Sequence, residues 1–235
     1  RVVLCDGAGT EYDGVIESLA PDEVRLSVSG ARPCPAEPRC RVTLFQALPK
    51  AGKLETVRDE RNRRLAAAHL GYAMPATPPD FGITPPTGSW AAPSPSAALI
   101  PCASRPEKLW PEAHWIAVGQ RLQAAGLTPV LVWGSDDERA RAERIAAGCG
   151  GVVPPFLSVA DMAAVLGQAR QIVGLDTGFS HLAAAFGAPT IGIYCDHDPG
   201  LAGITGPGPV ASFGGKAQVP TLDEVMAQLE RHLAA

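Results

Sequence analysis

The feature that most constrains the fold is a regular alternation of short β-rich runs with longer helical patterns from residue 97 onward. Strands are predicted at residues 98–100, 129–132, 152–153, 171–175 and 190–194, and helices at 111–125, 136–147, 160–169, 179–186 and 222–233. Strands that alternate with helices are typical of βαβ units, whose right-handed crossovers build a parallel sheet. The sequence therefore predicts an α/β, Rossmann-like parallel sheet domain over residues 97–235.

Residues 1–96 have a different sequence pattern. Short β-rich runs at residues 2–4, 12–16, 24–28 and 41–45 alternate with turn clusters, which predicts a small β-rich unit, an antiparallel barrel or sandwich. A helical pattern follows at about residues 58–70, and seven prolines between residues 72 and 98 then exclude a continuous helix or an internal strand. We therefore expect three parts: a β-rich segment at 1–57, a helix with a Pro-rich connector at 58–96, and the sheet domain at 97–235.

Composition and charge exclude several classes of protein. With 46% hydrophobic and 19% charged residues, the chain has the composition of a water-soluble globular protein. Its net charge of −4 argues against sequence-independent binding of nucleic acid, which depends on cations that displace counterions from phosphates. The longest apolar run, residues 181–195, is interrupted by Gly187 and Pro189, so no transmembrane segment is expected.

The six cysteines are scattered along the chain. A chain of this length needs no disulfides to hold its core, so we expect reduced thiols. Cys34 and Cys40 are the only close pair, and no second pair or nearby His completes a tetrahedral set, so no metal is expected. We expect no export signal and a cytoplasmic location, either in the cytosol or at the inner face of the inner membrane.

In a parallel sheet, ligands bind beyond the carboxyl ends of the strands, so the loops that follow the predicted strands hold the candidate site residues. After the strand at 171–175 come Asp176, Thr177 and Gly178, and His181 lies within the first turn of the next helix. Free backbone N–H groups and the positive end of the helix dipole favour an anion here, and Gly178 leaves room for its approach. The alternative is that Asp176 or Thr177 only caps the helix and that His181 is an ordinary surface residue.

Two further loops at the same edge carry charged side chains. Ser104, Arg105 and Lys108 follow the first predicted strand of this domain, and a guanidinium and an ammonium are the usual partners of phosphate. Glu138 lies at the start of the helix after the second strand, where it either complements the helix dipole or accepts hydroxyls of a sugar. Cations, N–H groups and carboxylates at one edge indicate a phosphorylated sugar or a nucleotide sugar. The sequence contains no Gly-x-Gly-x-x-Gly or Walker-type loop that would indicate a dinucleotide or a nucleoside triphosphate.

Three motifs in these loops resemble a known family. They are Arg-Pro-x-Lys-x-Trp-Pro-x-x-x-Trp at 105–115, Trp-Gly-x-x-x-Glu-Arg at 133–139 and Asp-Thr-Gly-x-x-His-Leu-Ala-Ala-Ala at 176–185. Together they resemble the ADP-heptose:lipopolysaccharide heptosyltransferases, family nine of the glycosyltransferases, and above all the heptosyltransferase I group. The resemblance runs from about residue 58 to the C-terminus. It implies the C-terminal, donor-binding half of a two-domain glycosyltransferase of the GT-B fold.

The resemblance also implies roles for the loop residues. The donor-binding set would be Ser104, Arg105, Lys108, Glu138, Asp176, Thr177, Gly178 and His181. Within it, Ser104, Lys108, Thr177 and Gly178 would hold the diphosphate, Glu138 the adenosine ribose and Asp176 the heptose hydroxyls, and His181 would lie beside the phosphates. The donor ADP-heptose would be a substrate, with no further cofactor. Ala103 stands where the family often has a hydroxyl, so one phosphate contact is expected to be absent.

The first 57 residues resemble a different family. Val2-Val3-Leu4-x-Asp6-Gly7-x-Gly9-x-Glu11-Tyr12 and the run at 41–50 are similar to the 16S rRNA uridine N3-methyltransferases, which implies a fragment of a PUA-like RNA-binding barrel. The segment carries seven basic and eight acidic residues, so we expect weak or no RNA binding. The acceptor-side lobe of the heptosyltransferases is not recognisable before residue 58. We therefore expect donor binding without transfer, and a lipopolysaccharide core acceptor only if an acceptor lobe is supplied. The alternatives are an RNA-binding fragment of the methyltransferase and a non-functional fusion.

Overall fold

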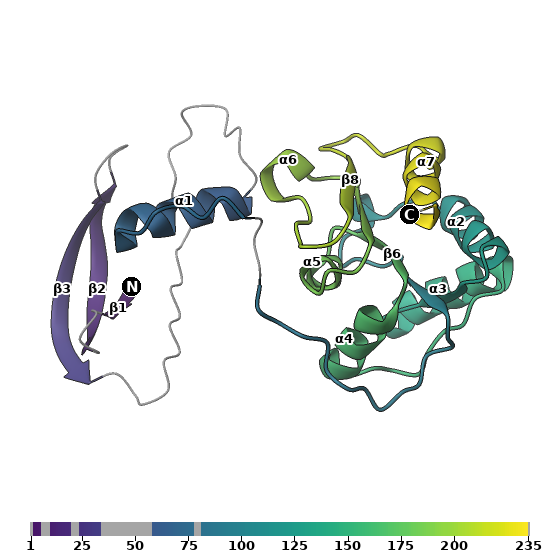
Figure 1. Ribbon diagram of the computed structural model, residues 1–235, viewed down its shortest axis with the longest axis horizontal. Helices are drawn as coiled ribbons and strands as arrows, with labels where there is room; N and C mark the ends of the chain where they lie inside the picture. The colour runs from purple at the N-terminus through teal and green to yellow at the C-terminus, as the bar shows by residue number, and fades with distance from the viewer. Residues whose placement is uncertain (1, 6–9, 20–23, 34–57, 78–80, 235) are drawn as a thin grey trace. The chain divides into compact units, whose positions relative to one another are not determined.

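The computed structural model describes residues 2–5, 10–19, 24–33, 58–77 and 81–234, with side chains from Asn62 onward. The chain divides into two units, Arg1–Lys53 and Leu54–Ala235. In the first unit, an antiparallel sheet contains β1 (Val2–Cys5), β2 (Thr10–Leu19) and β3 (Val24–Pro33) in the order β1-β2-β3 (Figure 1). The strand expected at residues 41–45 lies outside the described residues.

The second unit contains a five-stranded sheet in which every pair of neighbours is parallel, with the order β5-β4-β6-β7-β8. Its strands are β4 (Ser96–Ile100), β5 (Thr128–Leu131), β6 (Gln171–Leu175), β7 (Thr190–Tyr194) and β8 (Val210–Gly214). The α/β fold with a parallel sheet predicted from the sequence is confirmed. The chain goes from β4 outward to β5 and then returns to β6 on the other side of β4. This reversal makes the carboxyl ends of β4 and β6 the topological switch point, where open sheets of this class bind ligands.

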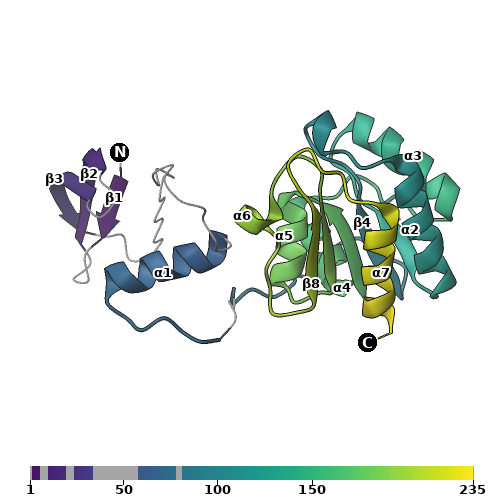
Figure 2. The ribbon, with the colours of Figure 1, turned by 90° about the horizontal axis from the view of Figure 1, so that it is seen from above.

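Helices cover both faces of the sheet (Figure 2). On one face lie α2 (Glu112–Ala124), α3 (Asp136–Cys149) and α7 (Leu222–Leu233), and on the other α4 (Val159–Gln168) and α5 (Gly178–Ala185). Successive strand residues point to opposite faces, so Leu99 packs in the first layer and Ala98 in the second. Buried apolar side chains fill the space between the sheet and the helices on each face, so the sheet core is a rigid base for the loops at its edge.

Some elements differ from the sequence-based prediction. The strand expected at residues 152–153 is only an isolated bridge from Val152 to Val130. The edge strand β8 and the short helix α6 (Pro199–Ala202) were not predicted, because each has five residues or fewer and α6 begins with Pro-Gly, too little for a periodic pattern. The predicted helix before the connector is α1 (Arg58–Leu70), and residues 81–95 form no helix or strand.

The helix starts follow local sequence signals. Thr221 and Glu224 form the reciprocal capping box expected at α7, and the hydroxyl of Ser158 accepts the N–H of Asp161 at the start of α4. Pro111 is the N-cap of α2, one position before the first turn in which it was expected. Within the described residues, no helix is both long enough and apolar enough to cross a membrane, and no group of three His, Cys, Asp or Glu is placed to hold a metal ion.

Candidate functional site

The switch point brings together two loops that are far apart in the sequence. The loop after β4, residues 101–111, is called the β4–α2 loop here, and it contains the 3-10 turn η1 (Pro106–Lys108). Beside it, the chain leaves β6 and enters α5 through Asp176 and Thr177. Because β4 and β6 are paired in parallel, both loops emerge at the same edge of the sheet. Lys108 of the first loop and Asp176 of the second are therefore neighbours.

Lys108 and Asp176 form the centre of the site. The ammonium of Lys108 lies 2.8 Å from Asp176 Oδ2 and also donates to the Asp176 carbonyl at 3.3 Å. On the other side, His181 Nε2 lies 3.6 Å from Asp176 Oδ1. The imidazole of His181 and the ammonium of Lys108 together lower the pKa of Asp176 to about 2, against the opposing effect of partial burial. Asp176 is therefore ionised throughout the physiological range of pH.

The start of α5 leaves backbone donors available. Thr177 is the N-cap residue, but its hydroxyl caps no backbone N–H and has no hydrogen-bond partner in the described structure although it is buried. The first bonds of the helix run from the N–H groups of Ser180 and His181 to the Thr177 carbonyl, so the N–H groups of Gly178 and Phe179 precede them. A Cβ atom at Gly178 would meet nothing within 4 Å. The helix start thus combines unpaired N–H groups with open space, as an anion site requires.

Arg105 and Ser104 lie further out on the β4–α2 loop. Arg105 forms ion pairs with Asp196, in the loop after β7, at 3.1 Å and with Glu107 at 3.1 Å, and its side chain is 49% exposed. Ser104 is exposed and makes no hydrogen bond with the described residues. The structure thus connects Arg105 to the loop after β7, whereas it leaves Ser104 outside the Lys108–Asp176 contact.

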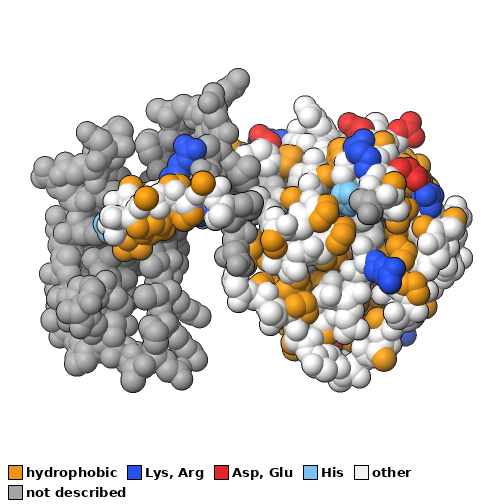
Figure 3. Space-filling view, viewed as in Figure 1, with side chains coloured by type: hydrophobic (Ala, Val, Ile, Leu, Met, Phe, Trp, Pro, Cys, Tyr) orange, Lys and Arg blue, Asp and Glu red, His pale blue; other side chains and the backbone are white. Residues whose placement is uncertain are grey.

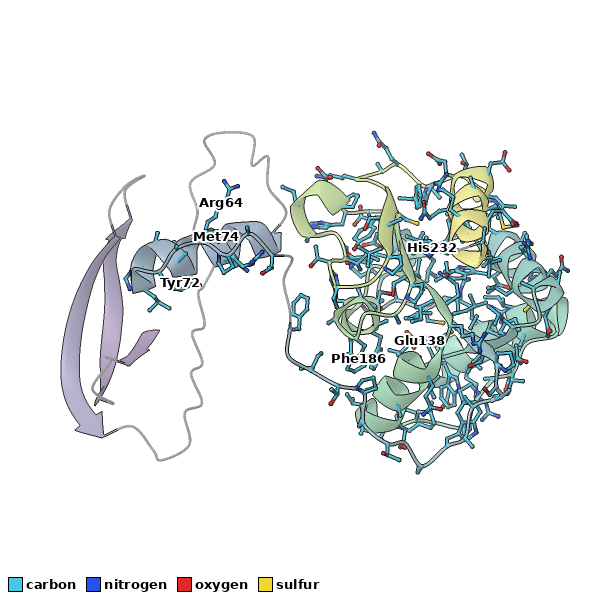
Figure 4. All side chains as sticks on the ribbon, in the orientation of Figure 1. Arg64, Tyr72, Met74, Glu138, Phe186 and His232 are labelled. Atoms are coloured by element: carbon cyan, nitrogen blue, oxygen red, sulfur yellow. The ribbon has the colours of Figure 1, made fainter. Side chains whose placement is uncertain are left out.

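Glu138 lies in the first turn of α3, the helix that follows β5 (Figure 4). One carboxylate oxygen accepts the backbone N–H of Gly134 at 2.8 Å, and the N–H of Glu138 donates to the hydroxyl of Ser135, the N-cap residue. This carboxylate therefore caps the start of its own helix. Cys102 connects the two loops, since its thiol donates to the Glu138 carbonyl at 3.6 Å.

Two buried thiols at this edge have no place in the chemistry. Burial raises the pKa of Cys102 to about 12 and that of Cys195 to about 11, so both stay protonated and are poor nucleophiles. Together with Cys149 they are free cysteines among the side chains that the structure describes.

Charged side chains on the surface are interspersed. On the face of the second unit shown in Figure 3, the Lys and Arg side chains lie between acidic and apolar ones and form no continuous basic area among the described residues. A cation at the switch point is therefore a local feature of the site. Arg141 on α3 was not among the predicted site residues, although its guanidinium donates to two carbonyls of the β4–α2 loop. As an arginine in a charged helix it carries no pattern that would distinguish it from its neighbours.

Comparison with known proteins agrees with this geometry. Glycosyltransferase family 9 (heptosyltransferase) matches residues 41–224. Lipopolysaccharide heptosyltransferase 1 of Pseudomonas aeruginosa is 40% identical over 149 residues, which are 63% of this chain and 42% of that protein. The Salmonella typhimurium protein of the same name is 37% identical over 167 residues, or 70% of this chain and 53% of that protein.

A solved heptosyltransferase structure is also similar to this chain. The E. coli heptosyltransferase WaaC with ADP aligns with a TM-score of 0.62 and 31% identity, over 80% of this chain and 60% of that one. The chain thus spans about half the length of the curated relatives that it matches. The heptosyltransferase resemblance of the sequence motifs is confirmed, and the chain belongs to glycosyltransferase family 9, the heptosyltransferase family.

Proposed function

We propose that this chain is the donor-binding half of a lipopolysaccharide heptosyltransferase and that its ligand is ADP-heptose. The observation that carries the proposal is the contact between Lys108 and Asp176 beside the open start of α5. A cation, a carboxylate and unpaired N–H groups within one small area match a sugar diphosphate, which offers anionic oxygens next to hydroxyls. The similarity to a heptosyltransferase solved with ADP supports the same ligand.

Lys108 can bind Asp176 and the diphosphate of the donor at the same time. An ammonium has three N–H donors, and Asp176 takes two of them through its carboxylate and its carbonyl. We assign the third to the diphosphate, together with the N–H of Gly178 and the hydroxyls of Thr177 and Ser104. Lys108 and the N–H of Gly178 would stabilise the diphosphate as its negative charge grows on leaving the sugar, because Asp176 and the helix start already orient them before the reaction.

The remaining roles follow from position along the edge. We assign the heptose hydroxyls to Asp176, which is ionised and can accept their hydrogen bonds. His181 lies beside the diphosphate, and Arg105 supplies a second cation at the outer end of the loop. Glu138 would exchange its bond with the Gly134 N–H for hydroxyls of the adenosine ribose.

We further propose that the 235-residue chain binds the donor without transferring heptose, and that a lipopolysaccharide core acceptor is bound only with an acceptor lobe. The resemblance of residues 1–57 to an rRNA methyltransferase, the RNA-binding alternative and the non-functional fusion stay predictions. All of the residues that carry that resemblance lie outside those whose side chains are described. Weak or no RNA binding and a cytoplasmic location, in the cytosol or at the inner face of the inner membrane, likewise stay predictions.

The experiment that tests donor binding is calorimetry of ADP with the full chain and with Lys108→Ala. We expect the variant to lose about 1.5–3 kcal/mol of binding free energy, as for a hydrogen bond to a charged group. Arg170→Ala is the matched control, since it removes an exposed cation that immediately precedes β6, at the opposite edge of the sheet. Equal ADP affinity in wild type and Lys108→Ala would refute the assignment of Lys108, and no ADP binding by the wild type would refute the proposal.

A further inference from the structure

Arg141 on α3 uses every nitrogen of its guanidinium. Its Nε donates to the carbonyl of Pro101 at 3.1 Å, one terminal nitrogen donates to the carbonyl of Trp110, and the other pairs with Glu112 at 3.0 Å. The side chain is only 14% exposed. A planar guanidinium suits such a triple contact, because its donors point in fixed directions within one plane.

The two carbonyls that it binds are the ends of the β4–α2 loop. Pro101 directly follows β4, and Trp110 directly precedes Pro111, the N-cap of α2. Both residues are buried, and the indole N–H of Trp110 donates to the Pro220 carbonyl. Lys108 lies between these two anchored ends. The Arg141 side chain thus connects both ends of the β4–α2 loop to α3 through hydrogen bonds.

The position of Arg141 on α3 adds a second connection. Arg141 lies about one turn after Glu138 on α3. The helix that carries the carboxylate proposed for the ribose therefore also carries the side chain that binds both ends of the β4–α2 loop. The neighbouring Arg144 differs in one useful respect. It binds the same Glu112 carboxylate but contacts neither loop carbonyl, and its side chain is 60% exposed.

We propose that Arg141 is a positioning residue that holds both ends of the β4–α2 loop on α3 and thereby fixes Lys108 against Asp176. The inference rests on the proposed function for its effect on donor binding, but its effect on Lys108 is independent of any ligand. Without the guanidinium, two buried carbonyls lose their donor, and the loop shifts to recover hydrogen bonds with water. Lys108 then moves away from Asp176.

The first test needs no ligand. The carboxyl pKa of Asp176 is measured by NMR titration in wild type, Arg141→Gln and Arg144→Gln. In the wild type we expect it near 2. We expect it to rise toward the ordinary value in Arg141→Gln, because Lys108 has withdrawn, and to stay low in Arg144→Gln. An unchanged Asp176 pKa in folded Arg141→Gln would overturn the proposal, since a merely stabilising side chain would not move this value.

The second test uses ADP calorimetry on the same full-length variants. We expect ADP affinity to fall about tenfold in Arg141→Gln, as for loss of a charged hydrogen bond, and to stay within about twofold in Arg144→Gln. The double variant Arg141→Gln/Lys108→Ala should bind ADP no more weakly than Lys108→Ala, because Arg141 acts through Lys108. Additive losses would overturn the proposal.

A milder variant covers the case in which Arg141→Gln does not fold. Arg141→Lys keeps the positive charge but lacks the planar fork, so we expect a partial rise in the pKa of Asp176 and a weaker affinity for ADP. Wild-type values of both in Arg141→Lys would overturn the proposal. A raised pKa of Asp176 combined with no ADP binding by the wild type would uphold the positioning role and refute the proposed function instead.

Discussion

Asp176 makes the site sensitive to acid. Its pKa is lowered to about 2, so its ion pair contributes stability above the ordinary pKa of an aspartate, and this contribution is lost as the pH falls through about 2. We expect Asp176→Asn to reduce the free energy of unfolding by about 2 kcal/mol at neutral pH. The difference between wild type and variant should shrink between about pH 4 and pH 2. Urea unfolding over this range measures it, and a difference independent of pH would contradict the assigned ion pair.

Substitution of Gly178 should affect ADP binding and the thermal stability of the chain in different ways. A Cβ atom there meets nothing within 4 Å, and alanine favours a helix over glycine by about 1 kcal/mol. We therefore expect Gly178→Ala to keep or raise the thermal midpoint. The added methyl group would lie where we place the diphosphate, so ADP affinity should fall severalfold. Calorimetry and thermal unfolding on one sample test both statements, and unchanged ADP affinity would place the anion elsewhere.

At the scale of elements, the site depends on how closely α5 packs against β6. The hydroxyl of Ser180 donates to the Leu175 carbonyl at 2.6 Å, and a Cβ atom at Gly174 would lie 2.3 Å from that hydroxyl oxygen and 3.0 Å from the side chain of Ile100. Only glycine fits this position. The start of α5, with its free N–H groups, is held at the switch point as a result.

We expect Gly174→Ala to push α5 away from β6 and to lower the free energy of unfolding by about 1–3 kcal/mol, as in other overpacked cores. ADP affinity should fall as well, because the N–H donors move with the helix. Chemical denaturation and calorimetry provide the measurements, and Gly178→Ala, at the start of α5, is the control for stability alone. Wild-type stability in Gly174→Ala would show that the helix can shift without loss.

At the scale of the whole molecule, the partners of the carboxylates bear on transfer. After β6 and β7, Asp176 is paired with Lys108, Asp196 with Arg105, and Asp198 accepts the N–H of Gly200. Transfer to a hydroxyl needs a base within hydrogen-bond reach, which contributes about 10²–10⁴-fold. Each of these three carboxylates already has a partner.

We therefore expect the purified chain to bind ADP-heptose and to release heptose only by slow hydrolysis. The measurement is heptose transfer to deep-core lipopolysaccharide by the chain alone, with an intact two-domain heptosyltransferase as the positive control. Turnover comparable to the control would contradict this expectation and would mean that other residues of the chain supply the base and the acceptor site.

Most helices and strands of the second unit, and the kinds of side chain at the sheet edge, could be predicted from the sequence. The bounds of β6, β7 and α7 agree with the prediction, because apolar runs and a capping box are signals within a few neighbouring residues. The strand order, the edge strand β8 and the contact of Lys108 with Asp176, 68 residues away, come instead from the packing of the whole domain. The same holds for the bonds by which Arg141 holds the two ends of the β4–α2 loop. These features depend on which distant segments pack together, and local periodicity carries no information about that choice.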